Sequence, residues 1–295
     1  MLKLGVPSKG RLMDQTFDWF HQRGITLRRA GSEREYAGAA DGIAGLELVL
    51  LSAGEIPREL AAGRIHLGVT GSDLVRDRLA DWDRQVTELA PLGFGRADLI
   101  IAVPASWPDV DTLDDLDAAA AAFRRTHGHR LRIATKYHRL VRDFLTRHGV
   151  ADYQLVDSQG ATEGTVKNLT AEAIADITST GETLRANHLK ILADGLIHQS
   201  QATLYAARTA DWGRGARAVL ADLAHCLGVD PSTVSSCRPD LLLGANTPGV
   251  RGPAPPRGPP QRRPISASAS AMSSGSTGSA GRPRGRSRGA SPGSR

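Results

Sequence analysis

Short apolar runs alternate with amphipathic segments through about the first 230 residues, and no other feature limits the fold as strongly. Residues 2–6, 46–51 and 99–103 have the length and composition of buried strands. Residues 11–23 instead place apolar side chains at spacings of three and four, and Gly24 follows them as a helix stop. Strands that alternate with helices in this way predict an α/β fold with largely parallel strands.

The alternation continues beyond these first elements. Further strands are predicted at residues 65–69, 131–134, 154–156, 174–178, 190–193 and 202–206. Further helices are predicted at residues 56–62, 113–126, 137–148 and 212–227. Thr112 and Asp115 have the spacing of a capping box and predict where the second of these helices begins.

The glycine-containing segment 93–95 stands where the pattern can pass from one lobe into another. A return of the chain after Asn187 would complete a discontinuous fold with a cleft between the lobes. We therefore expect lobe I to comprise residues 1–94 and 189–230, and lobe II to comprise residues 95–188.

The composition changes sharply near the end of the chain. Residues 241–295 contain nine Arg but no Asp, Glu or Lys, although the whole chain has a formal charge of +6. Without them, 28 basic and 31 acidic residues remain, so the apparent preference for nucleic acid belongs to the tail. Residues 231–295 are rich in Pro, Gly, Ser and Ala and predict a disordered tail. The alternatives are a basic arm that binds RNA or a partner, and an out-of-frame translation of a GC-rich reading frame.

Several classes of protein are disfavoured. The chain has no apolar run of about 18 residues, and its first residues lack the apolar region of a signal peptide. Cys226 and Cys237 are too few for a disulfide framework or a zinc site. His127 and His129 form a pair without further ligands. We expect a cytoplasmic protein with no membrane or nucleic-acid partner.

The segment 160–183 carries the strongest chemical signal. A largely apolar strand contains Asp176 and leads into a turn rich in hydroxyl groups and glycine, from which a helix can begin. Backbone N–H groups and a helix dipole at such a turn favour a phosphate, and the carboxylates before it can accept hydrogen bonds from ribose hydroxyls. The alternative is an ordinary capped turn, with Glu163 and Glu172 as solvated carboxylates. The candidate ligands are Glu163, Glu172, Asp176, Ser179, Thr180, Gly181, Glu182 and Thr183.

Five segments in this order resemble the ATP phosphoribosyltransferase family. They are LGVPSKGRL, GEIPRELAAGRIHLGVTGSDLV, LGFGRADLIIAVP, RIATKY and GATEGTVKNLTAEAIADITSTGETLRANHLKIL. The last is similar to the family's binding region for phosphoribosyl pyrophosphate (PRPP). The resemblance covers roughly residues 1–229.

The resemblance implies a two-lobed fold like that of type II periplasmic binding proteins. It implies transfer of the 5-phosphoribosyl group of PRPP to the adenine ring of ATP, giving phosphoribosyl-ATP and pyrophosphate in the first step of histidine biosynthesis. Mg²⁺ would be carried in by PRPP, so we assign no protein residues as metal ligands. The transition state would be oxocarbenium-like, and catalysis would rest on electrostatics and positioning.

Both substrates are polyanions, so the cleft needs fixed cations. Lys9, Gly10 and Arg11 follow the first strand, and Arg34 lies in a polar loop. We expect Arg11 and Arg34 to be catalytic and Lys9 and Gly10 to bind ATP or phosphate, because Arg offers bidentate contacts to phosphates. The alternative for Lys9 and Arg11 is a solvated helix start, where basic residues oppose the dipole.

Two further strand ends are candidate contacts for ATP or phosphate. Gly71, Ser72 and Asp73 follow one predicted strand, and Lys136 and Tyr137 follow another. Ligands bind at the carboxyl ends of strands in open α/β sheets. An ordinary helix cap is the alternative for Gly71, Ser72 and Asp73.

The chain departs from the family pattern at two places. Ser52 and Glu55 stand where many relatives have an Arg and an Asp, which leaves open the cation that meets pyrophosphate. Residues 230–295 lack the strand and helix pattern of the long form's regulatory domain. We therefore expect a short-form catalytic chain in a hetero-oligomer with a regulatory subunit similar to histidyl-tRNA synthetase. The alternatives are another PRPP-dependent purine phosphoribosyltransferase and a non-catalytic two-lobed ligand-binding protein.

Overall fold

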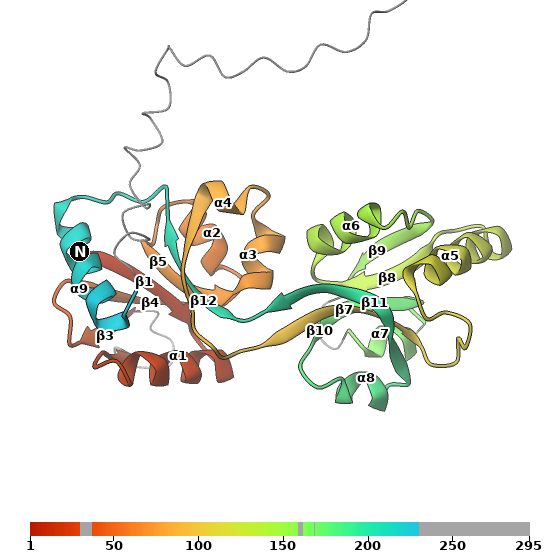
Figure 1. The fold of residues 1–295 in the computed structure, drawn as a ribbon, viewed down its shortest axis with the longest axis horizontal. Coiled ribbons are helices and arrows are strands. Elements are labelled where there is room, and N and C mark those ends of the chain that lie inside the picture. The colour runs from red at the N-terminus through yellow and green to blue at the C-terminus, as the bar shows by residue number, and fades with distance from the viewer. Residues whose placement is uncertain (30–36, 159–161, 168, 230–295) are drawn as a thin grey trace, which may run out of the picture. The chain divides into compact units, whose positions relative to one another are not determined.

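The computed structural model describes residues 1–29, 37–158, 162–167 and 169–229, all within one compact unit (Figure 1). They form two lobes, each built on its own sheet. The strand order is β2-β3-β4-β1-β5-β12-β6 in lobe I and β11-β7-β10-β8-β9 in lobe II. The predicted two-lobed α/β architecture is confirmed, whereas the predicted tail lies outside the described residues.

Lobe I takes its elements from both ends of the described chain. Its strands are β1 (Leu2–Pro7), β2 (Thr26–Arg29), β3 (Ala37–Asp41), β4 (Leu46–Leu51), β5 (Leu67–Gly71), β6 (Val86–Pro91) and β12 (Ala202–Ala207). Its helices are α1 (Arg11–His21), α2 (Ile56–Ala61), α3 (Ser72–Arg78), α4 (Trp82–Gln85) and α9 (Arg214–Leu227).

Lobe II is formed by one continuous part of the sequence. Its strands are β7 (Ala97–Pro104), β8 (Leu131–Thr135), β9 (Tyr153–Asp157), β10 (Ala173–Thr178) and β11 (Leu189–Ser200). Its helices are α5 (Leu113–His127), α6 (His138–Arg147), α7 (Gly164–Lys167) and α8 (Glu182–Ala186). The predicted capping box at the start of α5 is confirmed, because Thr112 and Asp115 bond each other's backbone N–H.

The two sheets repeat one pairing pattern. In lobe I, β4, β1 and β5 are parallel, and β12 and β6 follow in antiparallel pairs. In lobe II, β9, β8 and β10 are parallel, and β7 and β11 follow in antiparallel pairs. This repeated order is the topology of the type II periplasmic-binding-protein fold, as the sequence predicted. Strands β1 and β8, and strands β5 and β10, are therefore equivalent in the two lobes.

Strand β7 shows why its segment reads as a continuous apolar run. Leu99 and Ile101 pack in the cluster beneath α5 and α6, whereas Ile100 and Ala102 pack in the cluster on the other face. Figure 1 shows α7 and α8 on that second face. A central strand with helices on both faces needs apolar side chains at every position.

The predicted boundary of lobe I at residue 189 is wrong. Strand β11 runs to Ser200 and pairs with β7, so residues 189–200 belong to the sheet of lobe II and the return follows Ser200. The sequence predicted that this strand ends at residue 193, because Asp194 and Gly195 interrupt the apolar run. The structure accommodates them in register shifts between Ile191 and His198, and Asp194 accepts a hydrogen bond from the backbone N of α5.

Candidate active site

The predicted site residues lie at the carboxyl ends of equivalent strands in the two lobes. Residues 9–11 follow β1 and residues 136–137 follow β8; residues 71–73 lie at the end of β5 and residues 179–183 follow β10. The carboxyl ends of strands are where open α/β sheets bind ligands. The topology therefore brings the predicted residues to the binding edges of the two sheets.

The turn between β10 and α8 has the geometry of an anion-binding loop. Gly181 has a φ of 71°, a left-handed conformation that favours glycine. The hydroxyl of Thr178 accepts from Gly181 N at 2.9 Å, and that of Thr180 accepts from Glu182 N at 3.3 Å. Ser179 and Thr180 are exposed, so their hydroxyls can reach a ligand. We call residues 178–183 the phosphate loop.

Arg185 is a candidate that sequence reasoning missed. Its Nη2 donates to Thr180 O at 3.1 Å, so its guanidinium lies against the phosphate loop. A Cβ built on Gly181 would lie 3.0 Å from Arg185 Nη1, which shows how closely the guanidinium approaches the turn. A cation in the first turn after a glycine loop is the signal that could have identified it.

Asp176 lies on β10, the strand that leads into the phosphate loop. It lies two residues before Thr178 on β10 and pairs in register with Ile100, whose side chain packs on the α8 side of the sheet. Because side chains alternate along a strand, Asp176 lies on the same face as Thr178 and Ile174. It is partly exposed, and one carboxylate oxygen accepts from Ile177 N at 2.8 Å, which leaves the other for a ligand.

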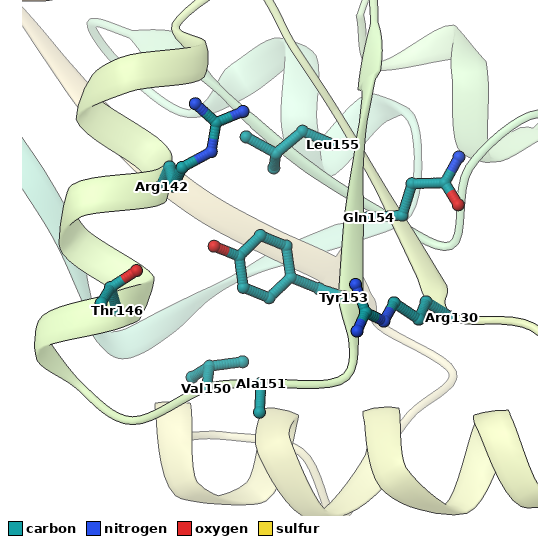
Figure 2. Close-up of a pocket in the computed structure, with 8 residues that line it drawn as sticks. All are labelled: Arg130, Arg142, Thr146, Val150, Ala151, Tyr153, Gln154 and Leu155. Atoms are coloured by element: carbon teal, nitrogen blue, oxygen red, sulfur yellow. The ribbon is translucent and has the colours of Figure 1, made fainter.

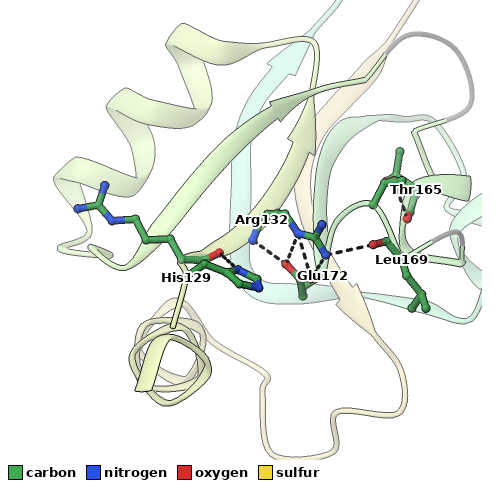
Figure 3. A network of polar contacts seen from close by, with 7 residues as sticks. His129, Arg132, Thr165, Leu169 and Glu172 are labelled. Carbon is green, nitrogen blue, oxygen red and sulfur yellow. Dashed lines mark hydrogen bonds and ion pairs between the residues drawn. The ribbon is translucent and has the colours of Figure 1, made fainter. Parts of the chain in front are cut away.

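Glu172 is not brought to the phosphate loop. It precedes β10, at the opposite end of the strand, and its carboxylate accepts from Arg132 N at 2.7 Å and from Arg132 Nη2 at 2.5 Å (Figure 3). The same Nη2 donates to Leu169 O at 3.0 Å. Burial acts to raise the pKa of Glu172, but its hydrogen bonds with Arg132 outweigh burial and lower that pKa below its ordinary value. The prediction that Glu172 contacts ribose is therefore wrong, because its carboxylate is used in a structural ion pair.

The loop between β1 and α1 is open to solvent. Lys9, Gly10 and Arg11 are exposed, and Gly10 has a φ of 78° at the start of the helix. Ser8 N donates to Leu51 O at 2.7 Å, which places this loop beside the end of β4. The side chains of Lys9 and Arg11 are therefore not used in packing.

Arg29 is a second cation that sequence reasoning missed. It comes from β2, and its guanidinium donates to Ser8 O in the loop between β1 and α1. Its Nη2 also lies 2.9 Å from Met13 Sδ. Arg34, predicted to be catalytic, lies outside the described residues.

Ser52 and Glu55, the two residues that depart from the family pattern, are hydrogen-bonded to each other. Ser52 donates to Glu55 through its hydroxyl at 2.7 Å and through its backbone N at 3.1 Å. These hydrogen bonds lower the pKa of the Glu55 carboxyl. Both residues are exposed at the end of β4, so this corner of lobe I presents a carboxylate rather than a cation.

Ser72, Asp73 and Tyr137 come together, but in a buried position. Ser200 Oγ donates to Asp73 Oδ1 at 2.6 Å, and the Asp73 carboxylate lies near enough to Tyr137 to shift the pKa of its hydroxyl. Burial, and next the Asp73 carboxylate, raise the pKa of Tyr137 far above its usual value. Asp73 and Tyr137 are 6% and 5% exposed, so they join the lobes rather than line an open surface.

His198 belongs to the same network and was not predicted. Its Nε2 lies 2.9 Å from Ser72 Oγ. Burial, and next the charge of Arg76, lower the pKa of His198, so the ring is neutral near pH 7. Only the pairing of β11 with β7 brings His198 to the start of α3, and no local pattern in the sequence could have shown this.

The remaining predicted residues are more accessible. Lys136 is exposed at the end of β8, while Gly71 and Glu163 are partly exposed. Glu163 comes just before α7, next to Thr162, whose hydroxyl accepts from Ser158 Oγ at 2.7 Å. Within the described ranges, no group of three His, Cys, Asp or Glu side chains could hold a metal ion. No helix in these ranges is long and apolar enough to cross a bilayer.

Two hollows lie near these elements. One of about 200 Å³ lies where the chain crosses between the lobes and is lined by Arg96, Asp98, Gln199, Ser200 and Gln201. The phosphate loop reaches this crossing, because Ser179 Oγ donates to Arg96 O at 3.3 Å. The second, of about 550 Å³, lies in lobe II between α6 and β9 (Figure 2). Its wall includes Arg130, Arg142 and Tyr153, and none of the predicted site residues lines it.

The fold and these loops define a class: a two-lobed α/β protein with a glycine- and hydroxyl-rich loop beside a carboxylate in lobe II and exposed cations in lobe I. Comparison with known proteins narrows this class. The sequence model of the HisG family, described as ATP phosphoribosyltransferase, matches residues 52–225.

Individual relatives agree with the family match. An ATP phosphoribosyltransferase of Cereibacter sphaeroides is 79% identical over 73% of this chain and 91% of its own length. One of Bradyrhizobium sp. is 50% identical over 73% of this chain, which spans 66% of that longer relative. A chain of the ATP phosphoribosyl transferase (HisG:HisZ) complex from Thermotoga maritima has a TM-score of 0.60 at 19% identity, covers 80% of this chain and 98% of its own, and shares the fold.

The chain belongs to the ATP phosphoribosyltransferase family. Its reaction is transfer of the phosphoribosyl group from PRPP to ATP, the first step of histidine biosynthesis. The resemblance seen in the sequence motifs is thereby confirmed.

Proposed function

We propose that PRPP binds to lobe II, with its 5-phosphate on the phosphate loop and its ribose hydroxyls on Asp176. The observation that carries this proposal is the phosphate loop, which contains hydroxyl groups and the left-handed Gly181. It begins at Thr178, two residues after the partly free carboxylate of Asp176 and on the same face of β10. Backbone N–H groups in such a turn suit a phosphate, and a carboxylate accepts two hydrogen bonds from vicinal hydroxyls. Arg185 adds a positive charge where the loop meets α8.

Lobe I supplies cations for the departing pyrophosphate and for the phosphates of the incoming ATP. Lys9 and Arg11 are exposed at the end of β1, and Arg29 holds the backbone of that loop from β2. In the reaction, the bond between ribose C1 and pyrophosphate breaks, and a ring nitrogen of adenine bonds to C1. Negative charge grows on the departing pyrophosphate, so fixed guanidinium and ammonium groups stabilise the transition state. Arg34 belongs to this proposal as the second catalytic cation.

Mg²⁺ enters this proposal as part of the substrate. The carboxylates of Asp176 and Glu182, at the phosphate loop, suit a hard cation held mainly by the phosphate oxygens of PRPP. When bound, the ion neutralises pyrophosphate charge. The residues of the chain bind the sugar phosphate, orient C1 toward adenine and hold the cations in place.

A regulatory subunit similar to histidyl-tRNA synthetase is the proposed partner. The structural relative from Thermotoga maritima is described as a complex of HisG with HisZ. Such a subunit would carry the feedback control by histidine. Co-purification with such a subunit, followed by mass measurement of the complex, tests this partner.

The test of the PRPP site is Asp176→Asn. An amide cannot accept both ribose hydroxyls as the carboxylate does, so we expect PRPP to bind about tenfold more weakly with ATP binding unchanged. Isothermal titration with PRPP and Mg²⁺ measures the change. Asp114→Asn, at an exposed carboxylate of α5, is the control. Unchanged PRPP affinity in Asp176→Asn would remove Asp176 from the site.

A further inference from the structure

Helix α3 of lobe I carries two buried carboxylates that contact lobe II. Asp73 and Asp77 are four residues apart, so they lie on one face of the helix. Both are less than a tenth exposed. Buried carboxylates without partners are costly, so their partners identify what this face does.

The partner of Asp77 is the first turn of α6. One of its carboxylate oxygens accepts from Arg139 N at 3.0 Å and from Leu140 N at 3.3 Å. Arg139 Nε also donates to the backbone O of Asp77 at 3.1 Å. Residues 139 and 140 are the second and third of the helix, so Asp77 acts as an N-cap residue supplied from the opposite lobe. Two of the free N–H groups at the start of α6 are thereby occupied.

The Asp73 carboxylate accepts from Ser200 Oγ and raises the pKa of Tyr137, the residue just before α6. The first residues of α3 are in turn hydrogen-bonded to the segment that joins β11 to β12. Ser72 N donates to Gln201 O at 3.1 Å, and Asp73 bonds to Ser200 through both its backbone N and its carboxylate. Helix α3 is therefore attached through its N-terminal end to the segment between β11 and β12, and along one face to lobe II.

We propose that Asp77 is a positioning residue for phosphoribosyl transfer, which holds the start of α6 against α3 and so fixes how PRPP on lobe II meets the cations and ATP on lobe I. This inference rests on the proposed placement of the two substrates. Asp77 lies about one helix turn beyond Asp73, the predicted ligand contact on the same helix. Reaction between two bound substrates is sensitive to small errors in alignment, so this contact should affect turnover more than PRPP affinity.

The decisive variants separate the geometry of the contact from its charge. Asn at position 77 can still accept from the N–H groups of α6, because Asn is a good N-cap residue. Glu keeps the charge, but its longer side chain cannot occupy the same position. We expect Asp77→Ala to lower kcat by about tenfold with the PRPP Kd within about threefold, and Asp77→Asn to restore kcat to within about threefold. Asp77→Glu should turn over more slowly than Asp77→Asn.

The matched control is Asp115→Ala. Asp115 also uses its carboxylate at a helix start, but it caps α5 within lobe II. Both alanine variants should lower the unfolding temperature, whereas only Asp77→Ala should lower kcat. The full chain is assayed with and without the regulatory subunit.

Two results would overturn the proposal. One is an Asp77→Ala variant that loses stability like Asp115→Ala yet keeps its kcat. The other, decisive even if the alanine variant fails to fold, is a kcat for Asp77→Glu equal to or above that of Asp77→Asn. The Asp176→Asn titration tests substrate placement separately, so the failure of one proposal can be distinguished from that of the other.

Discussion

At the scale of the residue, Asp176 and Glu172 show what the sequence could and could not predict. Both are carboxylates before a hydroxyl-rich turn, and both suggested a ribose contact. Asp176 lies two residues from Thr178, which keeps it on the same face of the strand. Glu172 lies six residues from Thr178, about 20 Å along an extended strand. Its partner Arg132 is 40 residues away in sequence, so the ion pair could not be inferred locally.

The Arg132–Glu172 pair predicts how stability depends on pH. Because the pKa of Glu172 is lowered in the folded state, the pair stabilises the fold above the unfolded carboxyl pKa of about 4.3. This contribution is lost as the pH falls through the folded pKa. Glu172→Gln should therefore lower the free energy of unfolding by about 1–2 kcal/mol at pH 7, and by less at pH 3.5. Urea unfolding at both pH values measures the difference.

The same variant tests the correction made to the site. With Glu172 bonded to Arg132 and away from the phosphate loop, Glu172→Gln should leave the PRPP Kd within about twofold of the wild type. A loss of PRPP affinity as large as that of Asp176→Asn would return Glu172 to the site.

At the scale of the element, local patterns located most of the core strands and the long helices. They missed β6 at one edge of the sheet of lobe I. They also missed β2 and β3, whose segments contain Arg28, Arg29, Gly38 and Asp41 instead of an apolar run. These two strands lie at the other edge of the sheet, where side chains need not be apolar on both faces. The register shifts in β11 arise from pairing with β7, so they too were hidden from local reasoning.

The turn from β10 into α8 yields a prediction about Arg185. Its guanidinium bonds to Thr180 O, so it both orders the phosphate loop and places a charge beside it. Arg185→Ala should raise the KM for PRPP by about three- to tenfold, whereas Arg185→Lys, which keeps the charge but not the planar fork, should give a smaller increase. Arg125→Ala, at an exposed arginine of α5, is the control for lost charge. A KM equal to that of Arg125→Ala would show that Arg185 acts only on stability.

At the scale of the whole molecule, the two-lobed plan could be predicted from the glycine segment 93–95 and from the family resemblance, and both lobes repeat one strand order in the structure. The point where the chain returns from lobe II to lobe I could not be predicted. The sequence of β11 fits pairing with β7 and pairing with a strand of lobe I equally well. Contacts between lobes, such as Asp77 with α6, depend on that pairing and on two segments 62 residues apart. Motif order identified the family, and the three-dimensional contacts then showed which of the predicted residues are used in structural contacts.

The last prediction concerns the charge of the whole chain. Residues 245–295 contain nine Arg and no acidic residue, so a chain that ends at Gly244 changes from a formal charge of +6 to −3. The proposed substrate contacts all lie before residue 186, so the shortened chain should keep kcat and both KM values within about twofold. It should also lose any weak, salt-sensitive binding to RNA that the full chain shows in fluorescence anisotropy, since such binding depends on phosphate contacts by Arg and Lys. A fall in kcat on truncation would mean that the basic residues of the tail act in catalysis and not only on the net charge.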